Sequence, residues 1–301
     1  MPQASLRYTV AVASYNRPGQ LAGLLASWRA VDYPREGFEL LLIDDGSPTD
    51  YAAEVERHRG DLEVRLFRLP HGGVSAGRRS ALERARAPYI VITDDDCRPA
   101  RDCLRACDAA TSRRPLAAWG GQVENLLVDN PCAAASQWIV NYVTARWNAA
   151  GPAVFFSGSL LVFPTAELRQ RGTLDFAWPP GAAGEDRALC ERWRASGGEL
   201  FACPGLRTGH VHQLNLAGFW RQHHFYGRGK RELETRRPAG RTGTPRLSRP
   251  GFYLGLVLGP WRAFGLRRGA LVSALVLVAQ LALLVGYLGY RPAVPSGGKP
   301  A

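Results

Sequence analysis

Short apolar runs that alternate with stretches of helical periodicity are the feature that most constrains this chain. Four runs have the length and composition of β-strands: residues 8–14, 38–43, 64–69 and 89–93. Two intervening stretches, 21–28 and 75–86, are typical of helices. Strands that alternate with helices predict an α/β domain built on a parallel sheet with right-handed crossovers.

Polar residues lie just after three of these runs, at 16–19, 44–47 and 94–96. The carboxyl ends of parallel strands meet at one edge of a sheet, where such folds bind ligands. We therefore expect these segments to form one shared site. For Asp44 and Asp45 taken alone, a turn that caps the next helix is the simpler interpretation.

Three adjacent carboxylates, Asp94, Asp95 and Asp96, follow the fourth run. They repel one another unless they are exposed or a cation neutralises them. In an extended segment Asp94 and Asp96 point to the same face. Carboxylate oxygens suit Mg²⁺ or Mn²⁺, and such an ion can bridge a diphosphate. We therefore expect a divalent-metal site here, with a solvated acidic turn as the alternative.

Two other short motifs carry candidate catalytic groups. Glu185 and Asp186 precede a helical pattern, where a carboxylate can act as a general base or simply be favoured by the helix dipole. His210 and His212 lie two residues apart in an extended segment, so they share a face and can ligate one metal ion. Such a pair is more often structural, and neither motif is specific by itself.

The C-terminal region contains an uncharged run of 22 residues, 269–290. A helix of that length covers about 33 Å, enough for the hydrocarbon core of a bilayer. We expect a transmembrane helix, with a buried core helix as the alternative. The apolar run 251–264 is shorter and contains Pro260 and Arg262. We expect it to be an interfacial or re-entrant segment, or else half of a two-pass hairpin.

The net charge of +12 lies entirely in the last quarter of the chain. Residues 1–220 hold 24 basic and 24 acidic residues, whereas 221–301 hold 14 basic and two acidic ones. The balanced first part disfavours nucleic acid as a partner, and the basic part suits membrane lipids. By the positive-inside rule, the main domain lies on the cytoplasmic side of the inner membrane and the C-terminus lies across it.

The stretch 227–250 is rich in Arg, Gly, Pro and Thr and is expected to be a juxtamembrane linker. Four side chains between 221 and 228 are candidates for contacts with acceptor, phosphate or lipid headgroups: Arg221, Gln222, Tyr226 and Arg228. An interfacial basic helix over 221–230 is the simpler interpretation of this segment. The six cysteines form no CxxC pair and no zinc-module spacing. This indicates reduced thiols in a cytoplasmic domain.

Together, these motifs resemble glycosyltransferase family 2, whose members are nucleotide-sugar transferases of the GT-A fold. The resemblance covers roughly residues 7–230 and rests on motifs in the family's order. They are 10–17, 43–47, 72–78, 93–99, 184–186, and Pro204 followed by His210. The resemblance implies a GT-A (Rossmann-like), mostly parallel sheet domain over 1–220. We expect four further parts after it: a basic segment (221–250), an apolar segment (251–264), a membrane helix (269–290) and a tail (291–301).

The resemblance also implies roles for individual residues. Asp186 matches the catalytic base, and Glu185 supports it. The candidate ligands of Mn²⁺ or Mg²⁺ are Asp94, Asp96, His210 and His212. The residues expected to contact the nucleotide sugar are Ser14, Tyr15, Asn16, Arg17, Asp44, Asp45, Arg78, Asp94 and Asp95.

Three departures from the family pattern concern the acceptor side. Arg79 stands where Asn is usual, Ser-Gly-Ser at 157–159 stands where Asn is frequent, and 171–175 replaces Gly-Gly-Phe-Asp-Glu. The Gln-x-x-Arg-Trp motif of processive synthases is absent, and only one clear membrane segment follows. This favours transfer of a single sugar over polymer extrusion.

The expected enzyme is thus inverting and metal-dependent, and it moves one sugar from a nucleotide-diphosphate sugar to a hydroxyl of a lipid-linked or cell-envelope glycan. A sugar nucleotidyltransferase is one alternative, but it needs a glycine-rich basic phosphate loop, which residues 8–19 lack. A membrane-tethered module that binds nucleotide sugars without transferring them is the other. It would not need the base or the metal carboxylates, and both are present.

Overall fold

The structure is a computed structural model that describes residues 5–58, 60–149, 152–174, 178–179, 181–236 and 249–292. The chain divides into two compact units. The first, the sheet unit, comprises Met1–Pro180 and Glu185–Gln213. The second, the helical unit, comprises Gly181–Gly184 and Leu214–Ala301. The domain boundary expected after residue 220 thus falls a few residues inside the helical unit.

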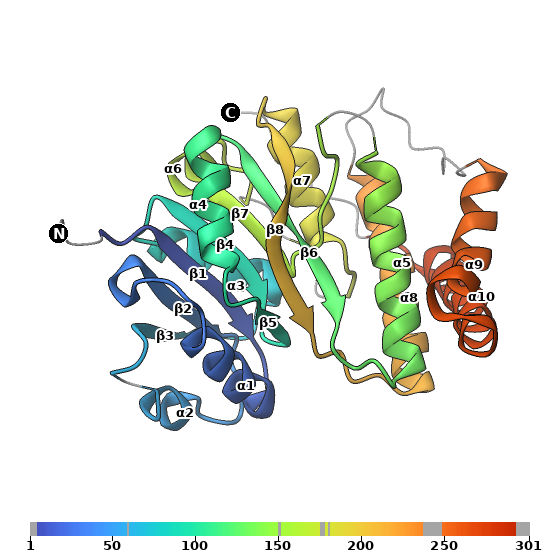
Figure 1. Cartoon of the computed structure of the whole chain (residues 1–301), viewed down its shortest axis with the longest axis horizontal. Helices are drawn as coiled ribbons and strands as arrows, with labels where there is room; N and C mark the ends of the chain where they lie inside the picture. The colour runs from blue at the N-terminus through green and yellow to red at the C-terminus, as the bar shows by residue number, and fades with distance from the viewer. Residues whose placement is uncertain are drawn as a thin grey trace. The chain divides into compact units, whose positions relative to one another are not determined.

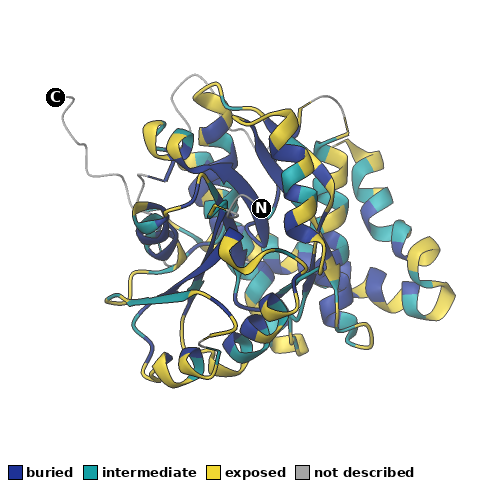
Figure 2. Cartoon of the chain, turned by 60° about the vertical axis from the view of Figure 1, so that its left-hand side comes forward, coloured by how far each residue is buried: buried dark blue, intermediate teal, exposed yellow. Residues whose placement is uncertain are grey.

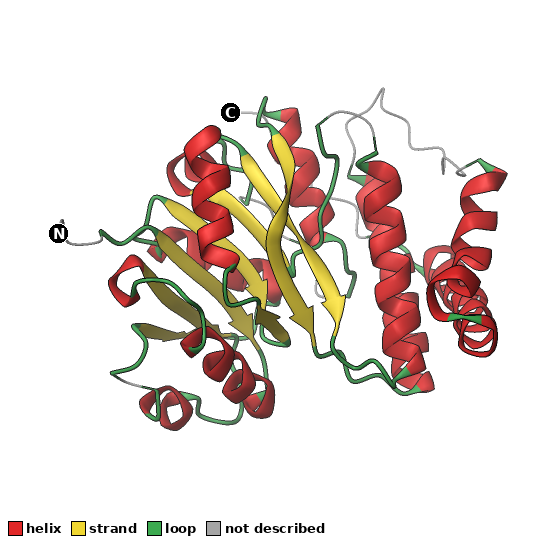
Figure 3. Cartoon of the chain, in the orientation of Figure 1, coloured by secondary structure: helices red, strands yellow, loops and turns green. Residues whose placement is uncertain are grey.

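An eight-stranded sheet forms the centre of the sheet unit, in the order β3-β2-β1-β4-β7-β6-β8-β5 (Figure 3). The strands are β1 (Tyr8–Ser14), β2 (Phe38–Asp44), β3 (Val64–Arg68), β4 (Tyr89–Asp94), β5 (Cys97–Pro99), β6 (Ala118–Asn125), β7 (Leu160–Pro164) and β8 (Leu200–His210). β3, β2, β1 and β4 are parallel, as are β6 and β8. β7 is antiparallel to both of its neighbours, and β5 is antiparallel to β8. The expected α/β fold is confirmed, and the antiparallel pairs lie in its second half.

Helices connect these strands and cover both faces of the sheet (Figure 1). They are α1 (Pro18–Arg29), the short 3-10 helix η1 (Arg35–Gly37), α2 (Ala52–Glu56), α3 (Val74–Arg84), α4 (Cys103–Arg113), α5 (Pro131–Trp147), α6 (Thr165–Gln170) and α7 (Glu185–Ala195). α1 begins at Pro18, whose fixed φ suits the first helical turn. The Asn130 side chain caps α5 by accepting from the Ala133 N–H at 3.0 Å.

Neighbouring residues of the central strands pack into different cores. Val10 and Val12 of β1 pack in one cluster with Trp28 of α1, whereas Ala11 packs in the other cluster with Ala81 of α3. Figure 2 shows the strands buried beneath helices whose outer sides are exposed. Because both faces of the sheet are covered, its central strands β1, β2 and β4 appear in the sequence as largely apolar runs.

The helical unit consists of α8 (Leu216–Thr235), α9 (Pro250–Phe264) and α10 (Leu266–Gly289). The Asn215 side chain caps α8 by accepting from the Gly218 N–H at 2.7 Å. α9 and α10 join at Gly265, whose φ of 76° lies in the left-handed region that favours glycine. Within the described residues, α10 is the one helix long and apolar enough to cross a membrane.

α8 extends through the first part of the stretch expected to be a linker, to Thr235. Residues 237–248 of that stretch, and the expected tail from 293 onward, lie outside the described residues. The uncharged run 269–290 is helical nearly throughout, as part of α10. That α10 spans a bilayer stays a prediction.

Candidate active site

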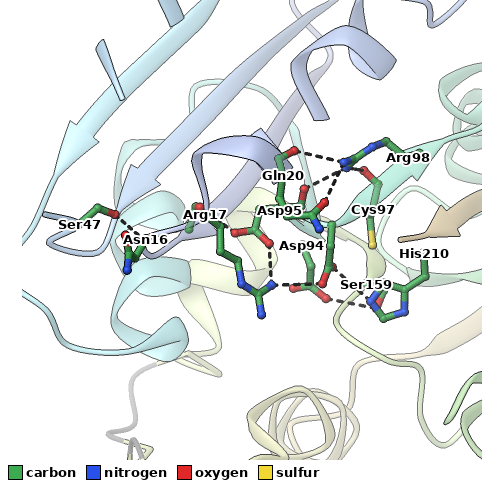
Figure 4. Close-up of polar contacts among 12 residues, drawn as sticks. Asn16, Arg17, Gln20, Ser47, Asp94, Asp95, Cys97, Arg98, Ser159 and His210 are labelled. Atoms are coloured by element: carbon green, nitrogen blue, oxygen red, sulfur yellow. Dashed lines mark hydrogen bonds and ion pairs between the residues drawn. The ribbon is translucent and has the colours of Figure 1, made fainter. Parts of the chain in front are cut away.

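The carboxyl ends of β1, β2 and β4 lie side by side in the sheet. Ser14 is in register with Asp44 across β1 and β2, and Ala13 with Asp94 across β1 and β4. Figure 4 shows side chains from the residues after β1 and β4 converging at this edge. The polar segments that follow the three strands are therefore brought together, as the strand pattern predicts.

Arg17 forms ion pairs with two carboxylates of the acidic triplet. Its Nη1 atom lies 3.0 Å from Asp95 Oδ1 and 3.2 Å from Asp96 Oδ2. Ser14 Oγ donates to Asp95 Oδ2 at 2.7 Å. Burial raises the pKa of Asp95, and the charge of Arg17 opposes that rise. Arg17 thus relieves part of the repulsion expected among the three carboxylates.

The turn that carries Arg17 has an unusual backbone. Asn16 has a φ of 53° and is the one residue other than glycine with positive φ in the described part of the chain. Its N–H donates to Ser47 Oγ at 2.9 Å, and the Arg17 N–H donates to Tyr51 Oη at 2.9 Å. These bonds to the segment after β2 set the direction in which Arg17 leaves the turn.

The acidic triplet supplies atoms that fit a divalent cation. Asp94, Asp96 and Cys97 bring ligand atoms within 4.8 Å of one another. His210 Nε2 lies 3.2 Å from Asp96 Oδ1, and the His210 ring stacks on His212 with a centroid separation of 4.7 Å. Carboxylate oxygens are ligands that Mn²⁺ and Mg²⁺ prefer. Asp94 and Asp96 are the residues that would hold the ion, and ligation by His210 or His212 stays a prediction.

The charges in this cluster shift three pKa values. Burial opposes ionisation of Asp96, but the hydrogen bond and charge of His210 outweigh it and lower the Asp96 pKa to about 2. Burial lowers the pKa of His210, yet the hydrogen bond and charge of Asp96 raise it above its ordinary value. Burial and the charge of His210 lower the pKa of His212 to about 4. At neutral pH His212 is therefore an uncharged imidazole, the form that ligates metals.

Arg78 joins the acidic triplet to the Glu-Asp motif. Its Nη2 atom lies 3.1 Å from Asp94 Oδ1, and its Nη1 atom lies 3.0 Å from Glu185 Oε1. The side chain is only 5% exposed. Burial lowers the pKa of Arg78, but the charges of Glu185 and Asp94 raise it above its ordinary value. Two motifs far apart in the sequence thus share one buried guanidinium.

Gly158 lies between Arg78 and Asp186. Its N–H donates to Asp186 Oδ2 at 2.9 Å, while Asp186 Oδ1 accepts from the Arg187 N–H at 2.7 Å. A Cβ atom at position 158 would lie 2.3 Å from Arg78 Nη2. The absence of a side chain therefore lets the backbone that orients Asp186 pack directly against the guanidinium.

Asp44 and Asp45 are buried and hold the neighbouring loops. Asp44 Oδ1 accepts from the Ser47 N–H at 2.8 Å and so forms a local turn, but it does not cap the next helix, because α2 begins at Ala52 and has no side-chain cap. Asp45 Oδ1 accepts from the Gly72 N–H at 2.8 Å, and Asp45 Oδ2 from the Gly73 N–H at 2.9 Å. Both carboxylates thus bind backbone, and their contact with a nucleotide stays a prediction.

Five residues of this cluster were not among the expected ligand or catalytic groups: Tyr51, His71, Gln137, Gly158 and Ser159. His71 Nδ1 lies 2.8 Å from Asp45 Oδ2, and its ring stacks on Tyr15 with centroids 4.2 Å apart. Gln137 Oε1 lies 3.2 Å from His210 Nδ1. Ser159 Oγ donates to Asp94 Oδ2 at 3.2 Å. Two features of the sequence could have pointed to some of these residues: the glycines after position 71 and the departure from the family pattern at 157–159.

The four candidates after residue 220 belong to the helical unit. In that unit Gln222 Nε2 donates to Tyr226 Oη at 2.8 Å, and the Arg228 guanidinium lies 5.0 Å from the centre of the Tyr290 ring. The roles expected for them and for Arg221 stay predictions. The departure at 171–175 ends at a residue outside the described part of the chain.

Comparison with known proteins identifies the class. The model of the family described as "Glycosyl transferase family 2" matches residues 9–166, just over half of the chain. The chain therefore belongs to glycosyltransferase family 2, as the motifs predict.

Curated relatives match only a part of the chain. The poly(ribitol-phosphate) beta-N-acetylglucosaminyltransferase TarS of Staphylococcus aureus is 29% identical over 93 residues, which cover 30% of this chain and 16% of TarS. The hyaluronan synthase of Pasteurella multocida is 30% identical over 95 residues, 30% of this chain and 10% of the synthase. The matched part is thus a small fraction of these longer proteins.

Solved structures resemble nearly the whole chain. The mannosyltransferase PcManGT from Pyrobaculum calidifontis, in complex with GDP-Man and Mn²⁺, matches with a TM-score of 0.59 and 21% identity, over 93% of this chain and 76% of that one. S. aureus TarS 1–349 in complex with UDP-GlcNAc matches with a TM-score of 0.57 and 15% identity, over 94% of this chain and 89% of that one. At these identities the likeness establishes the fold, and the expected GT-A fold is confirmed.

Proposed function

We propose that this protein is an inverting, divalent-metal-dependent glycosyltransferase that moves one sugar from a nucleotide-diphosphate sugar to a hydroxyl acceptor. The observation that carries the proposal is the buried Arg78, which is ion-paired with both Asp94 and Glu185. A donor bound at the acidic triplet would then have its sugar beside Asp186. Family membership and the nucleotide sugars named for the similar structures support this chemistry.

The donor site in this proposal is the carboxyl edge of β1, β2 and β4. The residues proposed to contact nucleotide or diphosphate are Ser14, Tyr15, Asn16, Arg17, Asp44, Asp45, Arg78, Asp94 and Asp95. Tyr15 is 45% exposed and stacks on His71, so an aromatic surface is available to a base. Arg17 and Arg78 carry the positive charge that a diphosphate requires.

The proposed transfer is a single displacement. A bound metal ion would neutralise charge on the departing nucleoside diphosphate. Asp186 accepts the proton of the acceptor hydroxyl while the hydroxyl oxygen attacks the anomeric carbon, opposite the bond that breaks. The configuration at that carbon therefore inverts. Glu185 and Gly158 hold Asp186 in place, through Arg78 and through the backbone N–H.

We propose that the acceptor is a lipid-linked or cell-envelope glycan and that transfer takes place at the cytoplasmic face of the inner membrane. The apolar helix α10 and the concentration of positive charge in 221–301 support membrane association. Arg221, Gln222, Tyr226 and Arg228 are proposed to contact the acceptor or its phosphate. The relative named for poly(ribitol-phosphate) supports a hydroxyl-bearing polymer of this kind.

The proposal is tested with a panel of nucleotide sugars, with Mn²⁺ or Mg²⁺ and membrane lipid extract as acceptor. Release of nucleoside diphosphate with labelled sugar in the lipid fraction is the expected result. Chelation with EDTA should reduce the rate about 100-fold or more, and added metal should restore it. Nucleotide binding without transfer from any donor would favour the membrane-tethered binding module instead.

The variant Asp186→Asn tests the base. We expect the transfer rate to fall by about 1,000-fold, because the amide cannot accept the hydroxyl proton. The affinity for nucleoside diphosphate should change little, as measured by calorimetry. Asp61→Asn, an exposed aspartate paired with Arg29, is the matched control and should keep full activity. Normal turnover by the Asp186 variant would remove the assignment.

A further inference from the structure

The helix α10 has two unlike sides. The side chains buried along it are mostly small: Gly269, Val272, Ser273, Leu275, Val276, Ala279, Ala282 and Gly286. Its large exposed hydrophobic side chains are all aliphatic: Leu266, Leu271, Leu277, Leu281, Leu284, Val285 and Leu288. At 3.6 residues per turn these two sets fall on opposite sides of the helix. One side of α10 is therefore packed within the unit, and the other is an open aliphatic surface.

The packed side of α10 is covered by α8 and α9. A Cβ atom at Gly227 of α8 would lie 2.0 Å from the carbonyl oxygen of Leu283, and one at Gly286 would lie 2.0 Å from that of His224. The backbones of α8 and α10 thus touch. Trp261 Nε1 of α9 donates to Ser273 Oγ at 2.9 Å, which attaches α9 to the first half of α10.

The part of α8 that contacts α10 is strongly polar. Arg231 Nη1 donates to Tyr287 Oη at 3.2 Å, and its guanidinium lies 5.2 Å from the ring centre. Tyr290 Oη donates to Glu232 Oε2 at 3.0 Å. The last turns of α10 therefore pack against charged residues of α8, a helix that begins six residues after β8 ends.

This packing conflicts with a helix that spans the bilayer from its N-terminal end. Arg267 and Arg268 would lie on one side of the membrane, and Arg231 and Glu232 on the other. α8 would then have to carry its charges through hydrocarbon to reach them, which is costly. A two-pass hairpin fails for another reason. α9 is 15 residues long, which is about 22 Å. It is therefore too short to cross the hydrocarbon core of the bilayer and place the arginines of the α9–α10 turn on the far side.

We propose that the α9–α10 hairpin lies in the plane of the membrane and inserts the aliphatic side of α10 into one leaflet of an anionic bilayer. α8 then stays on the aqueous side. Charge complementarity identifies the partner, because Arg262, Arg267 and Arg268 surround the hairpin turn and 221–301 carries the whole net charge of +12. This in-plane insertion takes the place of the membrane-spanning helix that the uncharged run 269–290 led us to expect. It does not depend on the proposed transfer reaction.

The topology is tested in the full chain with an epitope tag after Ala301. Right-side-out and inverted membrane vesicles are treated with protease, and loss of the tag is compared with loss of the sheet unit. Insertion into one leaflet predicts that both are cleaved from the same side. A tag cleaved only from the opposite side would overturn the proposal and support the spanning helix.

The inserting surface is tested by vesicle flotation of the double variant Leu277→Glu, Leu281→Glu. Binding to phosphatidylcholine vesicles that contain phosphatidylglycerol should fall at least about ten-fold, because two inserted leucines become charged. Leu116→Glu, at a comparably exposed leucine of the sheet unit, is the matched control and should bind normally. Unchanged binding of the double variant, or equal binding of the unaltered chain to vesicles without phosphatidylglycerol, would overturn the proposal. Retained nucleotide binding verifies the fold and separates this test from the transfer reaction.

Discussion

Two clusters of buried charge stand at opposite ends of the parallel strands, and they differ in how their charges balance. Near the amino end of β2, Glu39 accepts from Arg65 Nη1 at 3.1 Å, from Arg86 Nε at 2.9 Å and from Thr9 Oγ1 at 2.6 Å. Burial raises the pKa of Glu39, but these hydrogen bonds lower it below its ordinary value. Arg86 also pairs with the half-exposed Glu63, so two carboxylates face two arginines and the charges of this cluster balance.

At the carboxyl end the balance is reversed. Arg78 is shared between Asp94 and Glu185, and burial raises the pKa of Glu185 despite that pairing. The Asp94 side chain is 33% exposed, whereas Glu39 is fully buried. Carboxylates here outnumber the cations that neutralise them. The comparison teaches that a charge cluster with complete internal partners stabilises the fold, whereas one with surplus carboxylates can still receive a cation.

The largest expected difference between the clusters comes from removing one arginine of each. Arg78→Ala should reduce transfer per folded molecule by about 100-fold or more, because Asp94 and Glu185 lose their shared partner. Arg86→Ala should leave that rate within about two-fold and cost about 1 kcal/mol of unfolding free energy, since Arg86 is 48% exposed. Transfer rates and urea unfolding of both variants check this. An equal loss of transfer in the Arg78 and Arg86 variants would contradict the proposed difference between the two charge clusters.

A smaller effect should follow from a single methyl group. Gly158→Ala places a Cβ atom against Arg78 and should shift both the guanidinium and the N–H that orients Asp186. We expect transfer to fall by about ten-fold to 100-fold, with nucleotide affinity little changed. Gly19→Ala is the control, because a Cβ atom there meets nothing within 4 Å. A Gly158 variant as active as the Gly19 variant would contradict this positioning role.

The smallest expected effect is on the pH dependence of stability. His212 has a pKa lowered to about 4 in the folded chain, so the unfolded chain binds more protons between pH 4 and its ordinary pKa of about 6.5. The stability that His212 contributes is therefore present above pH 6.5 and lost as pH falls towards 4. Melting temperatures of metal-free protein across that range should fall less for His212→Gln than for the unaltered chain. Parallel pH profiles would disprove the shift.

The first half of the fold could be predicted because its strands are buried on both faces. Residues 10–13, 40–43 and 90–92 are uninterrupted apolar runs within β1, β2 and β4. β6 and β8 gave no such signal: β6 contains two glycines, β8 contains Pro204 and Gly205, and their register shifts between Gly120 and Gln122. Both strands are formed by pairing with distant segments, which a local pattern does not report.

The site could be predicted where a motif follows a strand and not where a role depends on a distant partner. Asp94 and Asp96 follow β4, so topology alone brings them to the edge. The role of Gly158 depends on Arg78, eighty residues earlier, and that of Gln137 on His210. The part of α8 from residue 227 onward was expected to be a linker, because interior glycines disfavour helices. Gly227 and Gly229 are instead required by backbone packed against them.

The contact between α8 and α10 has a consequence for how this chain tolerates substitution. Positions 227 and 286 have no room for even a methyl group, because a carbonyl oxygen of the facing helix occupies that space. A complete mutational scan should therefore show depletion of every alternative residue at these two positions. The positions that do not tolerate substitution would then form two groups. One lies around Asp94 and Asp186, where the chemistry requires particular side chains, and the other lies between α8 and α10, where there is no space for a side chain.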